Sequence, residues 1–237
     1  MLSRGLRAAL LAAAASTLCA LAAGWVLLHL QGLAHLQAAV QLACALLLAW
    51  VAASLGWFAT GFVRGQQAIF ARSRAGTLAR KRVLALAPIL AGAALWNAWR
   101  RRAGASCHAI VDGLWLGDRT AARSRAWHLV LDLTSEYARP STTASPYVCL
   151  PWMDGTVLAE STLEEAAQML DTALKTPDAA VLVHCALGRW RSAQVLAYWL
   201  QTRRGLSAPQ AWELLRARRP QVKVPAFVRE TASRKAP

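Results

Sequence analysis

Residues 181–192 read Val-Leu-Val-His-Cys-Ala-Leu-Gly-Arg-Trp-Arg-Ser, and this stretch decides the fold of the C-terminal part of the chain. It opens with an apolar, valine-rich run, which is typical of a buried strand. A helical pattern runs from Ala193 to Leu200, so the residues in between must turn within a short loop. The stretch therefore predicts a strand, a tight loop and a helix, with Cys185 where the strand ends.

The loop after Cys185 has the composition of an oxyanion-binding site. Backbone amides that wrap into a helix N-terminus bind a tetrahedral anion, because the amides and the helix dipole both favour negative charge. The same field favours the thiolate form of Cys185. The guanidinium of Arg191 can hold two phosphate oxygens in a bidentate fork. The residues expected to bind the phosphate of a substrate are Ala186, Leu187, Gly188, Arg189, Trp190 and Arg191.

Two further residues fit the same chemistry. Gly188 stands where the loop must turn sharply, which predicts a positive φ. Ser192 can donate a hydrogen bond to the sulfur and so ease its departure in a second step. We therefore expect the Cys185 thiolate to attack phosphorus, after which water hydrolyses a phosphocysteine intermediate. The alternatives are an inert cysteine at a strand end and a silent domain that only binds phosphate.

The spacing His184-Cys185-(five residues)-Arg191-Ser192 resembles the signature of the cysteine-dependent protein tyrosine phosphatase superfamily, above all its dual-specificity branch. The resemblance implies that His184 orients the loop. It also implies a mobile loop that carries an aspartate general acid about thirty residues before the cysteine. Asp154, thirty-one residues before Cys185, fits that role, since the leaving oxygen needs a proton. The alternative is a plain Asp-Gly turn. No metal or other cofactor is expected.

The distribution of charged residues divides the chain into two segments of different composition. Residues 1–102 contain eleven Lys or Arg and no Asp or Glu, whereas residues 103–237 carry sixteen basic and all twelve acidic residues. An apolar, basic segment indicates a membrane partner, and no recognisable nucleic-acid module is present, so nucleic-acid binding is not expected. The sequence predicts a basic transmembrane region over 1–102 and a phosphatase domain over 103–237.

Two uncharged, apolar runs in the first part predict membrane spans at about 8–30 and 38–63. A third run, 83–99, is short, contains Pro88 and is basic at both ends, so it either crosses the membrane or lies in the interface. A cleaved signal peptide is the alternative for the first run. The basic clusters favour a cytoplasmic N-terminus and a cytoplasmic catalytic domain in a multi-pass integral membrane protein.

The second part alternates strand and helix patterns. Strands are predicted within 108–118, on either side of a turn at Asp112-Gly113, and at 128–133, 147–151 and 179–184. Helices are predicted at 120–126, from a capping box at Ser161 and Glu164 to Leu174, from 191 to near Gly205, and from Ser207 to Arg219. The expected fold is α/β, with a mostly parallel central sheet flanked by helices as in dual-specificity phosphatases, preceded by an all-α transmembrane region.

Three functions are compatible with these features. The first is a membrane-anchored phosphatase for protein phosphotyrosine or phosphoserine/threonine. The second is a lipid phosphatase for phosphoinositides or phosphatidylglycerophosphate at the membrane face, which the extra cation of Arg189 and the basic surroundings favour. The third is a catalytically silent phosphate-binding adaptor. Expected partners are therefore a phosphorylated protein or an anionic phospholipid, and the membrane. Cys107 or Cys149 is a candidate for a protective disulfide with Cys185.

Overall fold

The structure is a computed structural model that describes residues 4–28, 35–64, 67–101, 105–142, 144–156 and 158–226. The chain divides into two compact units. The first comprises residues 1–71 and 78–96, and the second comprises residues 72–77 and 97–237. The boundary predicted after residue 102 stays a prediction. The contacts give the second unit one more segment, 72–77, which the sequence analysis placed with the N-terminal region.

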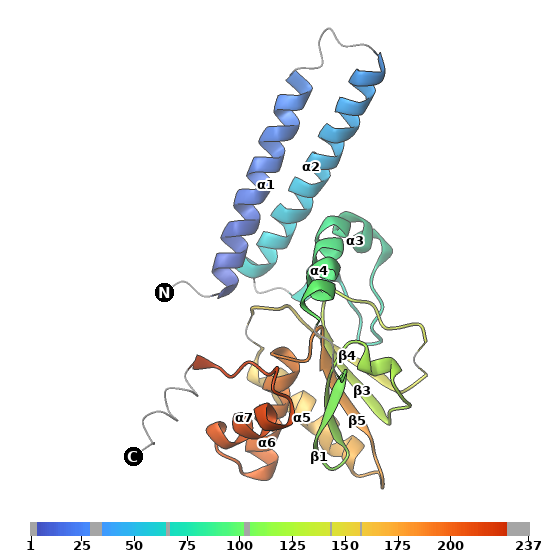
Figure 1. The fold of residues 1–237 in the computed structure, drawn as a ribbon, viewed down its shortest axis with the longest axis vertical. Coiled ribbons are helices and arrows are strands. Elements are labelled where there is room, and N and C mark those ends of the chain that lie inside the picture. Colours follow the sequence, from blue (N-terminus) through green and yellow to red (C-terminus); the bar gives the residue numbers. More distant parts are fainter. Residues whose placement is uncertain are drawn as a thin grey trace. The chain divides into compact units, whose positions relative to one another are not determined.

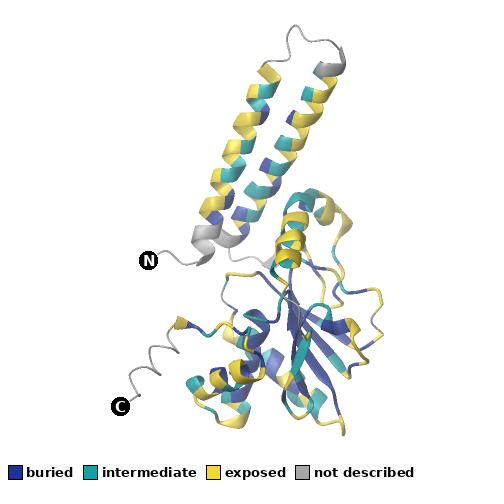
Figure 2. Ribbon diagram, in the orientation of Figure 1, coloured by how far each residue is buried: buried dark blue, intermediate teal, exposed yellow. Residues whose placement is uncertain are grey.

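The first unit contains two long apolar helices that pack against each other, α1 (Arg4–Leu28) and α2 (His35–Arg64) (Figure 1). Small side chains fill the contact between them, and the hydroxyl of Ser16 donates to the carbonyl of Ala52 at 2.6 Å. Figure 2 shows large parts of both helices in the colour of exposed residues; Leu11 is 72% exposed and Leu18 is 67% exposed. By length and composition, Ala9–Leu28 and Ala38–Gly61 can cross a membrane.

The third apolar run does not form one continuous long helix. A short 3-10 helix, η1 (Gln67–Phe70), is followed by α3 (Arg80–Ala85) and α4 (Ala87–Arg100), with a turn at Leu86 between the two α-helices. The fourteen residues of α4 span about 21 Å, which is less than the hydrocarbon thickness of a bilayer of about 30 Å. Within the described parts of the chain, only α1 and α2 are long and apolar enough to span.

The second unit is built on a five-stranded sheet in the order β1-β2-β5-β3-β4. The outer strand β1 (Cys107–Val111) is antiparallel to β2 (Leu114–Asp118), and all other neighbours are parallel. The remaining strands are β3 (Leu129–Thr134), β4 (Tyr147–Trp152) and β5 (Val181–Cys185). The mostly parallel α/β class expected from the sequence is confirmed, and β5 lies at the centre of the sheet.

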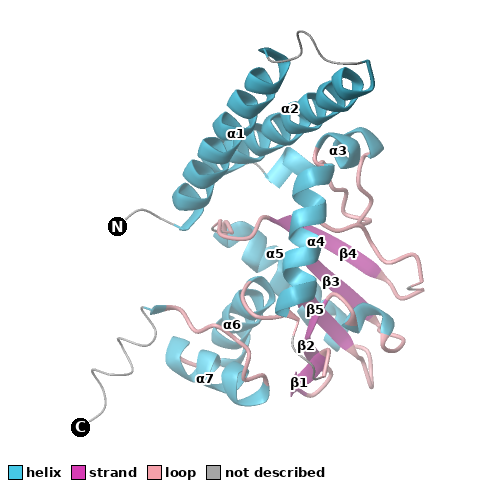
Figure 3. Cartoon of the chain, turned by 45° about the horizontal axis from the view of Figure 1, so that its top comes forward, coloured by secondary structure: helices cyan, strands magenta, loops and turns pink. Residues whose placement is uncertain are grey.

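Three helices cover one face of this sheet, namely α5 (Glu160–Leu174), α6 (Arg191–Arg204) and α7 (Ala208–Arg218) (Figures 1 and 3). Their apolar side chains form the larger core together with Val183 and Cys185 of β5. The opposite face carries a 3-10 helix, η2 (Ala121–Arg123), and a smaller core that includes Leu182. Side chains alternate along a strand, so Cys185 faces the helices and His184 faces the other way.

Two local predictions differ from the structure. The helix predicted over 120–126 is only the single turn η2. The helix α5 begins at Glu160 behind the extended residue Ala159, so the predicted capping box at Ser161 and Glu164 does not form. The side chain of Glu164 pairs instead with Arg203 of α6. That tertiary contact competes with the local cap for the same carboxylate.

Candidate active site

The loop between β5 and α6 curls around the sulfur of Cys185, at the C-terminal edge of the parallel strands. Gly188 has φ +62°, which confirms the positive φ expected from the sequence. A Cβ atom at this position would lie 2.4 Å from the carbonyl oxygen of Gly117. The close approach of the loop to β2 therefore excludes any side chain at residue 188.

The carbonyl groups of the loop are bound from outside. The buried guanidinium of Arg219 donates from Nε to the carbonyl of Gly188 at 2.9 Å and from Nη2 to that of Leu187 at 3.3 Å. The amide of Lys223 donates to the carbonyl of Arg189 at 2.9 Å. The peptides of the loop are thus held from outside, while the amide of Arg189 donates a hydrogen bond to the sulfur of Cys185. Sequence reasoning missed Arg219, although an arginine beside Pro220 at a helix end is a visible signal.

The sulfur of Cys185 is buried and lies in a field that favours its charged form. The hydroxyl of Ser192 donates to the sulfur at 3.3 Å. Burial alone would raise the pKa of Cys185, but the Arg191 guanidinium and hydrogen bonds from Ser192 and the amide of Arg189 lower the pKa below its usual value. The structure thus brings together Cys185, Arg191 and Ser192 as the sequence predicted, with the thiol poised to ionise.

Arg191 is held by a carboxylate that the sequence analysis did not identify. Its Nη1 donates to Oε2 of Glu136 at 2.9 Å and to the carbonyl of Trp152 at 2.7 Å, and its Nη2 donates to Oε1 of Glu136 at 2.6 Å. Burial would raise the pKa of Glu136, but the Arg191 charge lowers it. The bidentate contact fixes the plane of the guanidinium, whose side chain is only 2% exposed.

Asp154 lies in the turn that follows β4 and is exposed. The turn is held by Thr156, whose hydroxyl donates to the carbonyl of Met153 at 2.7 Å and accepts from Nε1 of Trp152 at 3.1 Å. The charge of Asp154 is near enough to Arg191 to be among the groups that raise the pKa of that arginine. Its side chain therefore belongs to the surroundings of the site.

His184 is buried on the face of the sheet opposite to the sulfur. Its Nδ1 lies 3.4 Å from the carbonyl oxygen of Cys185 and 3.7 Å from Oδ1 of Asp132, its register partner on β3. Burial lowers the pKa of His184, and the nearby charge of Asp132 opposes this effect. The imidazole thus lies buried beside Asp132, on the residue that directly precedes Cys185.

The last two residues of the loop direct their side chains to other parts of the second unit. Nη2 of Arg189 donates to the carbonyl of Arg100 at 2.9 Å, and the ring of Trp190 stacks on Trp212 with 6.3 Å between centroids. These contacts anchor the outer side of the loop. The second cation expected for a multiply charged substrate is engaged with the backbone.

Cys107 and Cys149 both pack in the smaller core, whereas Cys185 belongs to the larger core on the other face. Burial raises the pKa of the Cys149 thiol, which keeps it neutral. Neither cysteine is placed to form a disulfide with Cys185 without movement of the sheet.

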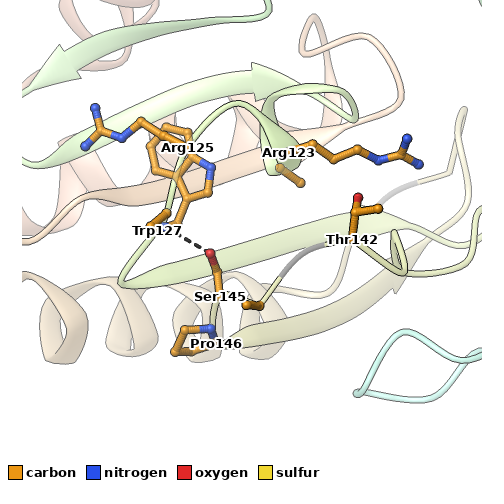
Figure 4. Close-up of a pocket in the computed structure, with 9 residues that line it drawn as sticks. Arg123, Arg125, Trp127, Thr142, Ser145 and Pro146 are labelled. Atoms are coloured by element: carbon orange, nitrogen blue, oxygen red, sulfur yellow. Dashed lines mark hydrogen bonds between the residues drawn. The ribbon is translucent and has the colours of Figure 1, made fainter.

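A cavity of about 450 Å³ lies elsewhere in the second unit (Figure 4). Its lining includes Arg123, Trp127 and Ser145, and the hydroxyl of Ser145 accepts a hydrogen bond from the amide of Trp127 at 2.9 Å. These residues precede β3 and β4, so the cavity is at the N-terminal edge of the parallel strands. Ligands of such sheets bind at the C-terminal edge, where Cys185 is found.

Comparisons with known proteins found similarity to one protein family and to several solved structures. The family model described as dual specificity phosphatase, catalytic domain, matches residues 121–231. Among solved structures, human DUSP28 is 20% identical with a TM-score of 0.48 and covers 56% of this chain and 95% of its own. A structure of DUSP15 is 20% identical with a TM-score of 0.48 and covers 55% of this chain and 87% of its own. A structure of PTPMT1 in complex with PI(5)P is 20% identical with a TM-score of 0.45 and covers 56% of this chain and 100% of its own. A search of curated proteins found no match.

Proposed function

We propose, from the premise that residues 121–231 form a catalytic domain of the dual specificity phosphatase family, that this protein hydrolyses phosphomonoesters through a phosphocysteine intermediate. One observation carries the proposal. A buried cysteine with a lowered pKa lies inside a loop of backbone amides, beside a guanidinium whose orientation is fixed by Glu136. This arrangement supports attack on a phosphate better than it supports a purely structural role.

The proposed reaction has two steps. In the first, the sulfur of Cys185 bonds to phosphorus, the bond from phosphorus to the ester oxygen breaks, and Asp154 protonates that oxygen. In the second, the Asp154 carboxylate accepts a proton from water, whose oxygen displaces the sulfur from phosphorus. Arg191 and the amides of the loop stabilise the equatorial oxygens in both transition states. The hydroxyl of Ser192 stabilises the sulfur anion as it leaves.

Phosphorylated proteins are the proposed first substrate class, with phosphotyrosine and phosphoserine/threonine both accepted. The side chain of Arg189 bonds to the carbonyl of Arg100, so the loop offers one phosphate site rather than a cluster of cations. A single phosphate ester on a side chain needs only the one phosphate site that the loop offers. A polyphosphorylated headgroup would leave further charges without a cation inside the loop.

Membrane anchoring through α1 and α2 is part of the proposal. Both helices are long and apolar enough to span, and they expose large leucines while burying small residues against each other. That distribution is the reverse of a soluble core and suits helices that face lipid. It also favours a second candidate substrate, an anionic phospholipid gathered by the basic, acid-free first part of the chain.

The test uses the full-length protein in lipid nanodiscs, with phosphate release measured on phosphotyrosine, phosphoserine and phosphothreonine peptides, phosphoinositides and phosphatidylglycerophosphate. We expect turnover of peptides that Cys185→Ser abolishes while orthovanadate or tungstate binding persists. Turnover confined to a lipid would favour the second candidate. Wild-type protein that binds tungstate without turnover of any substrate would contradict an enzymatic role and leave the phosphate-binding adaptor.

A further inference from the structure

We propose that Arg72 is a positioning residue of this site, because its guanidinium completes a buried network that holds Asp132 and, through Asp132, the imidazole of His184 behind Cys185. The inference rests on the proposed function and adds a residue that the same reaction needs. Arg72 comes from the linker, eight residues after α2 ends at Arg64 and far ahead of the matched catalytic domain. It nevertheless belongs to the second compact unit.

The segment 72–77 forms a tight turn that docks on the outer edge of the sheet. The amide of Ser73 donates to the carbonyl of Thr77 at 3.0 Å, and the amide of Gly76 donates to that of Ser73 at 2.9 Å. Gly76 has φ +82°, and a Cβ there would lie 2.8 Å from the ring of Tyr147. The amide of Cys149 on β4 donates to the carbonyl of Arg74 at 2.7 Å. The turn thus directs the preceding side chain inward.

The side chain of Arg72 is completely buried and is surrounded by acceptors. Its Nη2 lies 2.5 Å from Oδ2 of Asp132 and 3.2 Å from the hydroxyl of Tyr147. Its Nη1 donates to the hydroxyl of Thr134 at 2.6 Å and also to the carbonyl of that residue. The Asp132 side chain is only 2% exposed, so removal of Arg72 would leave a buried carboxylate without its cation.

Asp132 connects Arg72 to Cys185 through His184. Asp132 and His184 are register partners on adjacent parallel strands, and Oδ1 lies 3.7 Å from Nδ1. His184 directly precedes Cys185 and contacts its carbonyl oxygen. The orientation of the imidazole and its charge therefore depend on a carboxylate whose own charge is balanced by the linker. A charged imidazole would place a new cation and a new donor directly behind the thiolate.

The charges around His184 give the direction of the effect. Burial keeps the pKa of His184 below its usual value, the negative charge of Asp132 raises it and the positive charge of Arg72 lowers it. Loss of Arg72 should therefore raise the pKa of His184. The other ionisable groups that interact with this network are Asp118 on β2, Tyr147 and Cys149 on β4, and Glu136 after β3.

The experiment compares Arg72→Met with the matched control Arg74→Ala in the full-length protein. Arg74 lies in the same turn, but its side chain is 67% exposed and pairs at the surface with Glu165. For Arg72→Met we expect kcat on p-nitrophenyl phosphate to fall on the order of 10-fold or more, with KM changed less than about 2-fold, since misplacement near a nucleophile acts on the chemical step. Arg74→Ala should resemble the wild type.

The second readout is the titration of His184 by NMR of labelled histidines, assigned by substitution of the other four. We expect its midpoint to move to higher pH in Arg72→Met, to stay unchanged in Arg74→Ala, and to return in the double variant Arg72→Met/Asp132→Asn, which removes both charges. Arg72→Gln makes the same comparison if Arg72→Met does not fold. A merely structural arginine would lower the yield of folded protein without moving this midpoint.

An unchanged His184 titration in the folded Arg72 variant would overturn the proposal, as would a double variant with no recovery. The titration does not require turnover, so the two proposals fail separately. A shifted His184 in a protein that hydrolyses nothing would contradict the proposed function and leave the network intact. An active enzyme with an unshifted His184 would do the reverse.

Discussion

At the scale of single residues, the carboxylate of Glu136 accepts two hydrogen bonds from the guanidinium of Arg191, as a bound phosphate would. Both groups present two oxygens in the plane of a guanidinium. The carboxylate therefore fixes the orientation of Arg191 in the fold, and in the proposed reaction the entropy of orienting the guanidinium is lost on folding rather than on catalysis. The same contact compensates a cation that would otherwise be buried without a partner.

Acidification should destabilise the second unit through Glu136 and Asp132. Both carboxyl groups have a pKa lowered in the fold, since Arg191 and the pair His184 and Arg72 outweigh the effect of burial. Groups with a lowered pKa contribute stability above their unfolded values, near pH 4, and lose it as pH falls through the folded values. The urea midpoint, measured from pH 7 down to pH 3, should fall below about pH 4.

The variant Glu136→Gln separates the contribution of Glu136 to the pH dependence of stability from that of Asp132. It should cost on the order of 3 kcal/mol at pH 7, because a buried guanidinium loses its counter-charge. Its urea midpoint should also depend less on pH than that of the wild type. A pH dependence as steep as in the wild type would show that folding does not lower the pKa of Glu136.

Asp154 is testable through the leaving group. A general acid matters most where the departing oxygen is a strong base, so Asp154→Asn should reduce turnover of a phosphoserine peptide by about 10²-fold or more and that of p-nitrophenyl phosphate much less. Asp178→Asn is the control, since Asp178 is an exposed residue after α5. Equal losses on both substrates would remove Asp154 from the acid role.

Some residues of the site could be predicted because their signal is local. Cys185, Gly188, Arg191 and Ser192 occupy one continuous stretch, and a strand followed by a helix forces them around a common point. Glu136, Arg219 and Arg72 could not be found in this way. Each reaches the site through tertiary packing, which brings together residues far apart in the sequence, and no periodicity predicts that pairing.

At the scale of elements, the loop and β2 are fitted to each other through two glycines, Gly117 and Gly188. Gly188→Ala should therefore push the loop away from the strand and lower kcat by about 10²-fold or more, as the loss of oxyanion donors does. The control is Gly205→Ala, which has a similar φ of +67° but open space around its Cβ. It should cost about 1 kcal/mol of stability and leave kcat unchanged.

If both alanine variants lowered kcat to the same extent, backbone strain rather than the contact with Gly117 would be the cause.

The ends of the helices show which element boundaries can be predicted from a sequence. Gly205 ends α6 and α7 begins behind Ser207, both as predicted, and the side chain of Gln210 accepts a hydrogen bond from the amide of Ser207. The start of α5 was not predictable, because the side chain of Glu164 pairs with Arg203 on another helix and does not cap the start of α5.

At the scale of the whole molecule, the chain combines an apolar region without acidic residues and a domain of mixed charge. Two helices that expose leucines and bury alanines leave a large apolar surface uncovered, and lipid is the partner proposed for that surface. If both helices cross the membrane as proposed, the chain returns to the side on which it started, because the number of crossings is even.

That consequence can be measured with an impermeant thiol reagent on sealed vesicles. A cysteine placed in the link between α1 and α2, as in Gly32→Cys, should react from one side, and a cysteine at the exposed Arg218 of α7 should react only from the other. Detergent should make both react, which is the control, and the parent protein gives the background of native thiols. In intact cells the first should be labelled from outside, because the basic clusters favour the cytoplasm. Labelling of both positions from the same side would require a third crossing after α2, which the fourteen residues of α4 are too few to provide as a straight helix.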